Sequence, residues 1–401
     1  MPKHTRPLVL AALVTALTSL AVPALAAPAP PPGPPAGAGP SSAGTRAEPA
    51  PLHRATVPVP GQYIVTVKKD TTPDAVLKKA APTARRLFTY TAALHGFAAK
   101  LTPAQLTAVR ALPGVESVEE DGTAEATAPA ASWGLDRIDQ PYLPLDQQFT
   151  VHGTGAGVTA YVVDSGIDYR HADFGGRAAP GFDAIGDGRG GADCNGHGTH
   201  VAGTVGGATY GVARQASLVS VRVLDCAARG AWSGIIAGFD WVARNARQPA
   251  VLNGSLGGER SEAVNRAVDN VAARGVLPVI AAGNDAKDAC DVSPASAAWA
   301  LTVGATDHRD RETDFSNFGP CLTLYAPGKD VVSARAGGGS LALDGTSMAS
   351  PHVTGVAALY KAVHPSATAE EVGTWIVGQA TRDALTVSKS SPNRMLYTGG
   401  L

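Results

Sequence analysis

The chain has 401 residues, of which 44% are hydrophobic and 17% charged. It can therefore form one large domain and a smaller one, and wholesale disorder is excluded. The net charge of −1 gives no support for a nucleic acid or an anionic membrane surface as partner.

The N-terminus has the three parts of a secretory signal peptide. Lys3 and Arg6 precede an apolar run at 8–25, which ends in the small-residue pattern Ala24-Leu25-Ala26. The alternative is a membrane anchor, because the run approaches the ~20 residues that cross a bilayer. The small-residue ending favours cleavage, and no later run is apolar enough to span. We therefore expect residues 1–26 to be a signal peptide and the product to be secreted, extracellular and without stable membrane association.

Residues 27–60 are rich in proline and alanine, a composition typical of a disordered linker. Order is predicted to begin near Gly61, where the β-α-β-β-α-β pattern of a small α+β, ferredoxin-like unit starts. The acidic run Glu119–Gly122 and the Ala/Thr/Pro-rich segment after it predict an exposed junction that a protease can cut. The strands of this unit are expected at 63–67, 86–90, 96–101 and 115–118, and its helices at 72–81 and 102–112.

The rest of the chain alternates apolar strand-like runs with helical ones. This alternation predicts an α/β fold with a mostly parallel sheet and helices on both faces. Ligand sites in such folds lie at the carboxyl ends of the strands. Strands are expected at 158–163, 218–224, 251–256, 277–282 and 301–303, and helices at 234–245, 262–273 and 353–363.

The four cysteines are Cys194, Cys226, Cys290 and Cys321. In an exported protein an even number predicts two disulfides, with three possible pairings from the sequence alone. Free buried thiols are the alternative, which an oxidising compartment disfavours.

Three residues in separate motifs have the chemistry of a catalytic site, and each also has a simpler explanation. Asp164 follows an apolar run, where a carboxylate usually caps the next turn. His197 lies in NGHGTH, but a zinc site with His200 is disfavoured because the spacing is not HExxH and no third ligand is evident. Ser347 lies in GTSMASPH before a predicted helix, where it is either an N-cap or a nucleophile favoured by the helix N-terminus.

Together the three motifs are specific. Their chain order, Asp then His then Ser, is that of subtilisin and differs from the orders in two unrelated folds with the same groups. The sequences around Asp164, His197 and Ser347 resemble the signature blocks of the subtilisin-like serine peptidases, and most of all the aqualysin type of the proteinase K group. The resemblance extends from about 133 to 397.

The preceding segment resembles the inhibitor-like propeptide of the same family over 61–121, including HGFAAKL at 95–101. The resemblance implies a precursor that its own propeptide keeps inactive until cleavage near Glu125-Ala126. We therefore expect an inhibitory propeptide at 61–125 and the peptidase domain at 126–401.

The resemblance also assigns roles to the catalytic residues. It implies Ser347 as the nucleophile, His197 as general base and then acid, and Asp164 as the group that orients the imidazole. Asn284 matches the side-chain donor to the tetrahedral oxyanion, and the Ser347 amide is the expected second donor. The alternative for Asn284 is a turn residue after a strand.

Two segments match those that flank the substrate backbone and line the primary pocket, and a strand edge there would bind a peptide by β-augmentation. Their small, uncharged side chains imply broad, apolar-leaning specificity. Gly254 stands where relatives carry a larger apolar residue, which leaves the packing behind this strand open. Asn253 begins a glycosylation sequon that we interpret as accidental within a strand. The segments consist of Ser255, Leu256 and Gly257, and of Ala281, Ala282 and Gly283.

The resemblance implies the cysteine pairs Cys194–Cys226 and Cys290–Cys321. Each would close a loop of roughly 30 residues, and such cross-links typically contribute about 2–4 kcal/mol to stability.

A calcium loop of the family matches Asp136, Asp139, Gln140 and Asp146, whose hard oxygen atoms suit Ca²⁺. A solvated acidic turn is the alternative. A second family calcium site is expected to be lost, because Thr323 stands where Asp is usual. We expect calcium to be structural, and no cofactor for catalysis.

The sequence thus favours a secreted serine endopeptidase that hydrolyses polypeptides through an acyl-enzyme, is made as an autoinhibited precursor and acts as a monomer. One alternative is a catalytically silent binding or inhibitor protein on the same scaffold, which the intact triad disfavours. Another is a processing peptidase of narrow specificity. Such enzymes often carry acidic pocket residues or further domains, and the small, uncharged pocket segments disfavour this alternative.

Overall fold

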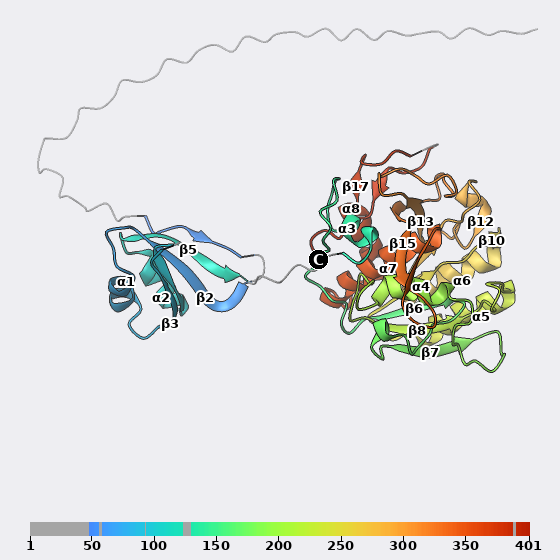
Figure 1. Ribbon diagram of the computed structural model, residues 1–401, viewed down its shortest axis with the longest axis horizontal. Coiled ribbons are helices and arrows are strands. Elements are labelled where there is room, and N and C mark those ends of the chain that lie inside the picture. Colours follow the sequence, from blue (N-terminus) through green and yellow to red (C-terminus); the bar gives the residue numbers. More distant parts are fainter. Residues whose placement is uncertain (1–47, 56–57, 93, 123–129, 388–389) are drawn as a thin grey trace, which may run out of the picture. The chain divides into compact units, whose positions relative to one another are not determined.

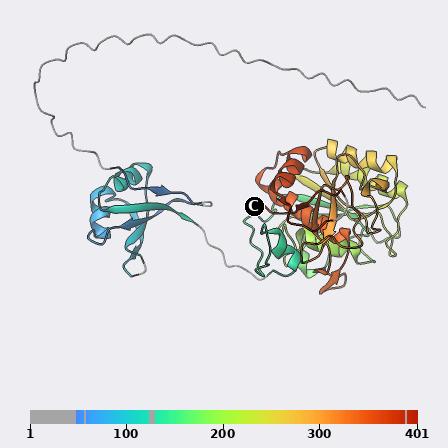
Figure 2. The same ribbon diagram turned by 90° about the horizontal axis from the view of Figure 1, so that it is seen from above.

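The computed structural model describes residues 48–55, 58–92, 94–122, 130–387 and 390–401. It consists of two compact units, Met1–Ala124 and Glu125–Leu401, which Figures 1 and 2 show from two directions. The expected signal peptide at 1–26 and the expected cleavage junction at 125–126 lie outside the described residues. No helix in the described ranges has both the length and the apolar character needed to cross a bilayer.

The smaller unit is a five-stranded sheet covered by two helices. Thr72 and Thr102 cap the helices, each accepting a hydrogen bond from the backbone N–H three residues on. The core joins apolar residues of the sheet with Val76 and Val109 of the helices. The predicted β-α-β-β-α-β order is confirmed, with one further strand ahead of it. The elements are β1 (Leu52–His53), β2 (Pro58–Val67), α1 (Pro73–Ala80), β3 (Arg85–Tyr90), β4 (Gly96–Lys100), α2 (Pro103–Arg110) and β5 (Val115–Gly122), with the strands in the order β1-β5-β2-β4-β3.

This unit is longer at both ends than the sequence predicts. β1 pairs in parallel with β5, with Leu52 opposite Val118, and β2 already begins at Pro58. The prediction of a disordered linker up to residue 60 is therefore wrong for its last part. Glu119–Gly122, predicted as an exposed junction, continues β5. Composition misses both segments because each is ordered by hydrogen bonds to a neighbouring strand and not by its own apolar residues.

The larger unit is built on a nine-stranded sheet in the order β17-β18-β14-β13-β11-β9-β6-β8-β7. All neighbouring pairs are parallel except β17–β18, so the predicted α/β class is confirmed. Two further pairs, β10–β12 and β15–β16, are antiparallel. The strands are β6 (Thr159–Asp164), β7 (Ala178–Asp183), β8 (Ser217–Arg222), β9 (Ala250–Gly254), β10 (Gly258–Glu259), β11 (Leu277–Ala281), β12 (Val292–Ser293), β13 (Leu301–Thr306), β14 (Leu324–Pro327), β15 (Val331–Ala334), β16 (Ser340–Leu343), β17 (Thr381–Arg382) and β18 (Arg394–Met395).

Helices cover both faces of this sheet (Figure 1). Successive residues of a strand point to opposite faces: Ala160 and Val162 of β6 belong to a core that includes residues of α4, α7 and α8. Tyr161 and Val163 belong to a second core that includes residues of α5 and α6. The sheet is therefore buried between two apolar cores. The helices are α3 (Trp133–Ile138), α4 (His197–Gly206), α5 (Trp232–Asn245), α6 (Glu262–Ala273), α7 (Thr346–Val363) and α8 (Ala369–Gln379), with 3₁₀ turns at Ala172–Phe174 and Ala289–Asp291.

The strand register aligns the site residues at one edge of the sheet. Val163 of β6 pairs with Gly254 of β9, which pairs with Ile280 of β11. The residues that follow, including Asp164 and Ser255, therefore lie side by side at the carboxyl edge. A Cβ on Gly254 would lie 2.7 Å from Cδ1 of Ile280, so the Ile280 side chain fills the space that a larger residue would need.

Candidate active site

His197 and Asp164 form a hydrogen-bonded pair at the carboxyl edge of the sheet. Nδ1 of His197, the first residue of α4, donates to Oδ1 of Asp164, the last residue of β6, at 2.8 Å. Because a carboxylate only accepts, this bond puts the proton on Nδ1 and leaves Nε2 as the basic nitrogen. Asp164 is fully buried, and the same oxygen accepts the Ser165 N–H at 2.7 Å.

The first turn of α4 is fixed against the turn that follows β6. Asp193 accepts hydrogen bonds from the Gly196 N–H at 2.9 Å and from the Thr199 N–H at 3.0 Å, which satisfies amides that the helix leaves unpaired. A Cβ on Gly198 would lie 2.2 Å from the Gly166 carbonyl oxygen. Glycine at 198 therefore allows the close approach that brings His197 to Asp164.

Opposing effects set the pKa of His197. Burial of the ring lowers this pKa, but the charge of Asp164 and its hydrogen bond, together with the charge of Asp193, outweigh burial. The pKa of His197 is therefore raised above its ordinary value of 6.5. The side chain remains 24% exposed, so it can be reached from solvent.

Ser347 lies in the first turn of α7, on the same cleft as His197. Its hydroxyl donates to the Ser255 carbonyl oxygen at 3.3 Å. The hydroxyl must turn from this acceptor toward His197 to pass on its proton. Catalytic hydrogen bonds are often long or misaligned before substrate binds.

Asn284 follows β11 and faces the start of α7. Its Oδ1 accepts the N–H and the hydroxyl of Thr346, both at 2.9 Å. Since a backbone N–H can only donate, these bonds identify the oxygen and leave the Nδ2 group on the exposed side. The first amides of α7 have no acceptor within the helix. Asn284 and the start of α7 thus present N–H donors near Ser347.

The cleft has a volume of about 660 Å³ and contains three of the six residues expected to bind substrate: Ser255, Leu256 and Gly257. The other three lie outside its lining, and Ala281 and Ala282 are buried. The sequence analysis did not predict Trp232, an aromatic residue of the lining that packs against Gly258. The full lining is His197, Leu224, Ala228, Arg229, Gly230, Ala231, Trp232, Ile235, Ser255, Leu256, Gly257, Gly258, Glu259 and Ser347.

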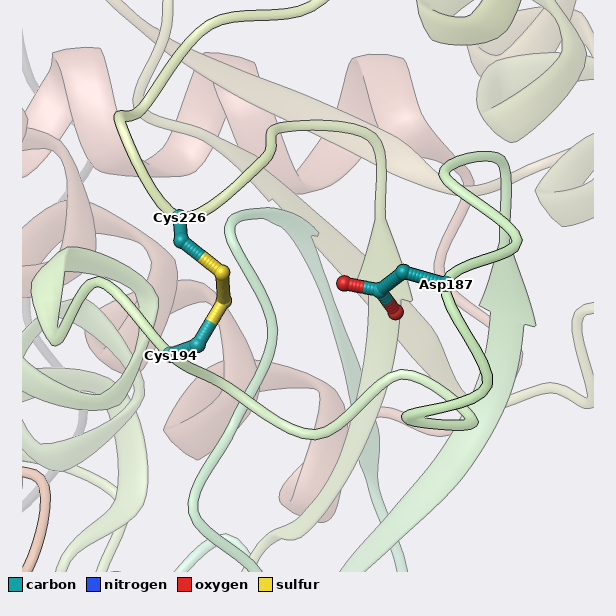
Figure 3. Close-up of side chains that lie close together, drawn as sticks. All are labelled: Asp187, Cys194 and Cys226. Atoms are coloured by element: carbon teal, nitrogen blue, oxygen red, sulfur yellow. A yellow bond between two sulfur atoms is a disulfide. The ribbon is translucent and has the colours of Figure 1, made fainter.

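Disulfides join Cys194 to Cys226 and Cys290 to Cys321, the pairs that the resemblance implies. Figure 3 shows Asp187 facing the first of them. Within the described ranges this is the one group of three His, Cys, Asp or Glu ligand atoms within 4.8 Å of one another. It is not a metal site, because the sulfur atoms are bonded to each other and Arg222 binds both oxygens of Asp187, at 2.6 and 2.8 Å.

Asp136 lies in α3, and the other expected calcium residues, Asp139, Gln140 and Asp146, lie in the segment that follows it. The two oxygens of Asp136 accept the N–H groups of residues 146 and 147. Gln140 donates through Nε2 to the carbonyls of residues 142 and 144. Burial, and then the charges of Asp146 and Asp136, raise the pKa of Asp139 to about 6. The carboxylates repel one another, although they do not all lie within 4.8 Å.

Comparisons with known proteins agree with this geometry. Residues 155–395 match the subtilase family, and residues 62–127 match peptidase inhibitor I9. The chain is 45% identical over 387 residues to an extracellular serine proteinase of Thermus sp. (strain Rt41A), covering 90% of this chain and 94% of that protein. It is 38% identical to a cuticle-degrading protease of Metarhizium anisopliae, over 90% of this chain and 96% of that protein.

Among solved structures, a cold-adapted subtilisin-like serine proteinase is similar, with 46% identity and a TM-score of 0.66. The alignment covers 68% of this chain and 99% of that one. The chain belongs to the subtilase family and is a serine endopeptidase of the subtilisin type that carries an inhibitor I9 propeptide.

Proposed function

We propose that the enzyme cleaves polypeptides by acyl transfer, with Ser347 as the nucleophile and His197 as the base and then the acid. Asp164 orients the imidazole and stabilises its protonated form. The observation that carries this proposal is the hydrogen bond from His197 Nδ1 to buried Asp164 on the cleft that Ser347 lines. It leaves Nε2 of His197 as the only ring nitrogen able to take a proton.

In the proposed reaction, Ser347 Oγ attacks the scissile carbonyl carbon while its proton moves to Nε2 of His197. The oxygen that becomes negative accepts hydrogen bonds from Asn284 Nδ2 and from the Ser347 N–H. His197 then gives the proton to the leaving amine. Water, activated by His197 in the same way, hydrolyses the ester on Ser347. All these groups belong to the chain, so the reaction needs no cofactor.

The lining of the cleft supports a broad, apolar-leaning specificity. Leu224, Trp232, Ile235 and Leu256 are the large apolar residues of its lining. The two charged residues in the lining, Arg229 and Glu259, are exposed. A peptide binding beside 255–257 would pair by β-augmentation, which selects an extended backbone before it selects side chains.

The direct test is hydrolysis of casein and of a mixed peptide library by the purified product. We expect cleavage after many apolar residues, and inhibition by serine-directed reagents. Cleavage of a single peptide from the library would contradict broad specificity. An absence of cleavage by correctly processed enzyme would contradict the catalytic assignment.

Removal of the Asn284 side chain should mainly slow turnover. For Asn284→Ala we expect kcat to fall by about 10²–10³-fold with KM little changed, because the donor acts on the transition state. This is the loss measured for the same donor in subtilisin, a relative. The control is Asn245→Ala on the surface of α5, which should keep kcat. Equal losses in kcat and in affinity for substrate would argue against an oxyanion role.

We further propose that the chain is secreted and that the I9 unit inhibits it until cleavage near residue 125. The names of the similar proteins and the I9 match support this proposal. Added separately, residues 48–125 should inhibit the mature enzyme at low concentration. Residues 61–125 lack β1 and the start of β2, so they should inhibit less well. Folded 48–125 without inhibitory effect would refute the proposal.

Structural calcium at Asp136, Asp139, Gln140 and Asp146 is proposed on electrostatic grounds. Burial, and after it the charges of Asp146 and Asp136, raise the pKa of Asp139, and a bound cation stabilises the ionised carboxylates against both effects. Carboxylate and amide oxygens suit calcium. Calcium has no part in the chemistry of Ser347.

Removing calcium with EGTA should lower the midpoint of thermal inactivation without changing turnover at moderate temperature. At a calcium concentration of 100 times Kd, mass action gives about 2.7 kcal/mol of stabilisation. Asp139→Asn keeps an acceptor for the Thr150 N–H but removes the charge, so most of the calcium response should be lost. Asp240→Asn on α5 is the control. Identical melting curves of the wild-type enzyme in EGTA and in millimolar calcium would refute the site.

A further inference from the structure

The helix that carries Ser347 contains a proline in its second turn. Pro351 lies inside α7, and proline has no N–H to donate to the carbonyl four residues earlier. That carbonyl belongs to Ser347. In a regular helix the nucleophile's own carbonyl would be bound by residue 351, and here the helix cannot do so.

A serine outside the helix supplies the missing hydrogen-bond donor. Oγ of Ser255, the residue after β9, donates to the Ser347 carbonyl oxygen at 2.9 Å. The carbonyl oxygen of Ser255 accepts the Ser347 hydroxyl at 3.3 Å. The carbonyl oxygen and the hydroxyl of Ser347 are therefore both hydrogen-bonded to Ser255, a residue that is only 2% exposed.

Asn253 holds Ser255 in the orientation that this contact needs. Its Nδ2 donates to Ser255 Oγ at 2.9 Å, which directs the serine's own proton toward the Ser347 carbonyl. Its Oδ1 accepts the hydroxyls of Ser350 and Thr354 on α7, each at 2.9 Å. Asn253 is fully buried, which also rules out its use as a glycosylation site in the folded protein.

We infer that Asn253 and Ser255 are positioning residues of the acyl-transfer reaction, acting through the carbonyl of Ser347. They replace the helical hydrogen bond that Pro351 removes, and so fix the peptide unit between Ser347 and Met348. This inference rests on the proposed role of Ser347. It concerns the orientation of Ser347, whereas an ordinary buried hydrogen bond would affect stability alone.

The test asks whether the effect of Ser255→Ala on kcat depends on the proline at position 351. Ser255→Ala should lower kcat by about tenfold with KM unchanged, and should slow phosphonylation of Ser347 by a fluorophosphonate to the same extent. Pro351→Ala restores an N–H that can reach the Ser347 carbonyl. In that background the loss caused by Ser255→Ala should shrink to about threefold or less.

Each variant is expressed as the full precursor, and active enzyme is counted by titration of Ser347. Ser220→Ala is the matched control, because Ser220 is also buried and donates to a backbone carbonyl, that of Gly191, at 2.8 Å. It should lower the melting temperature without lowering kcat. Asn253→Asp provides a second variant if Ser255→Ala does not fold, since its carboxylate accepts the Ser255 hydroxyl and withdraws it from Ser347.

The inference is overturned if the loss in kcat is equal in both backgrounds, or if Ser255→Ala leaves kcat unchanged. Failure of the proposed function would be seen separately. In that case casein hydrolysis would persist in Ser347→Ala, or be absent from the processed wild-type enzyme.

Discussion

Replacement of Ser347 by alanine is expected to lower the turnover of peptide substrates by about 10⁶-fold and to leave the chain as an uncleaved precursor. The physical reason is that both reactions require a covalent bond from Ser347 Oγ to a carbonyl carbon. That loss is the one measured for the nucleophile of subtilisin, a member of the same family. The remaining rate should reflect the oxyanion donors and substrate binding alone.

The measurement is casein hydrolysis together with mass spectrometry of the secreted product, in a host that lacks other proteases. The Ser347→Ala product should begin near Ala27 and keep its propeptide. Ser220→Ala, which removes a buried serine hydroxyl that donates to the Gly191 carbonyl outside the active site, is the control. A Ser347→Ala product processed as fully as the wild type would refute self-cleavage while leaving hydrolysis of other substrates to be judged by the casein assay.

Replacement of Asp164 by asparagine is expected to lower kcat by about 10⁴-fold, because the imidazole loses the partner that fixes its tautomer and stabilises its charged form. The substitution should also shift the pH dependence of kcat/KM. The charge of Asp164 is what raises the pKa of His197 against the effect of burial, so removing the charge should lower this pKa.

The direction of the pH shift follows from the role of His197 as a base. Only the neutral ring accepts a proton, so activity is lost as pH falls through the His197 pKa. In the wild type the acid limb of kcat/KM should lie above pH 6.5. In Asp164→Asn the limb should lie at lower pH, and rates from pH 5 to 9 would show it. An acid limb that does not move would mean that another group controls the profile.

The sequence by itself predicted the candidate catalytic residues and determined the order of the elements. Asp164, His197 and Ser347 each lie in a motif of fewer than ten residues, and a local pattern needs no knowledge of distant contacts. Helices α5 and α6 were predicted to within two residues because their apolar residues repeat with the period of a helix. The class of the fold followed from the alternation of strands and helices.

Only the tertiary structure decided which residues support that chemistry. In the sequence Asn253 matches a glycosylation sequon. In the fold its side chain accepts hydrogen bonds from two side chains of α7, about a hundred residues away in the chain. The strand at Leu52–His53 is ordered by β5, and its own composition predicts disorder. Trp232 lines the cleft beside Gly258, although the two residues are 26 positions apart in the chain. Such roles depend on partners brought together by strand register and helix packing, and a local sequence pattern carries no information on these.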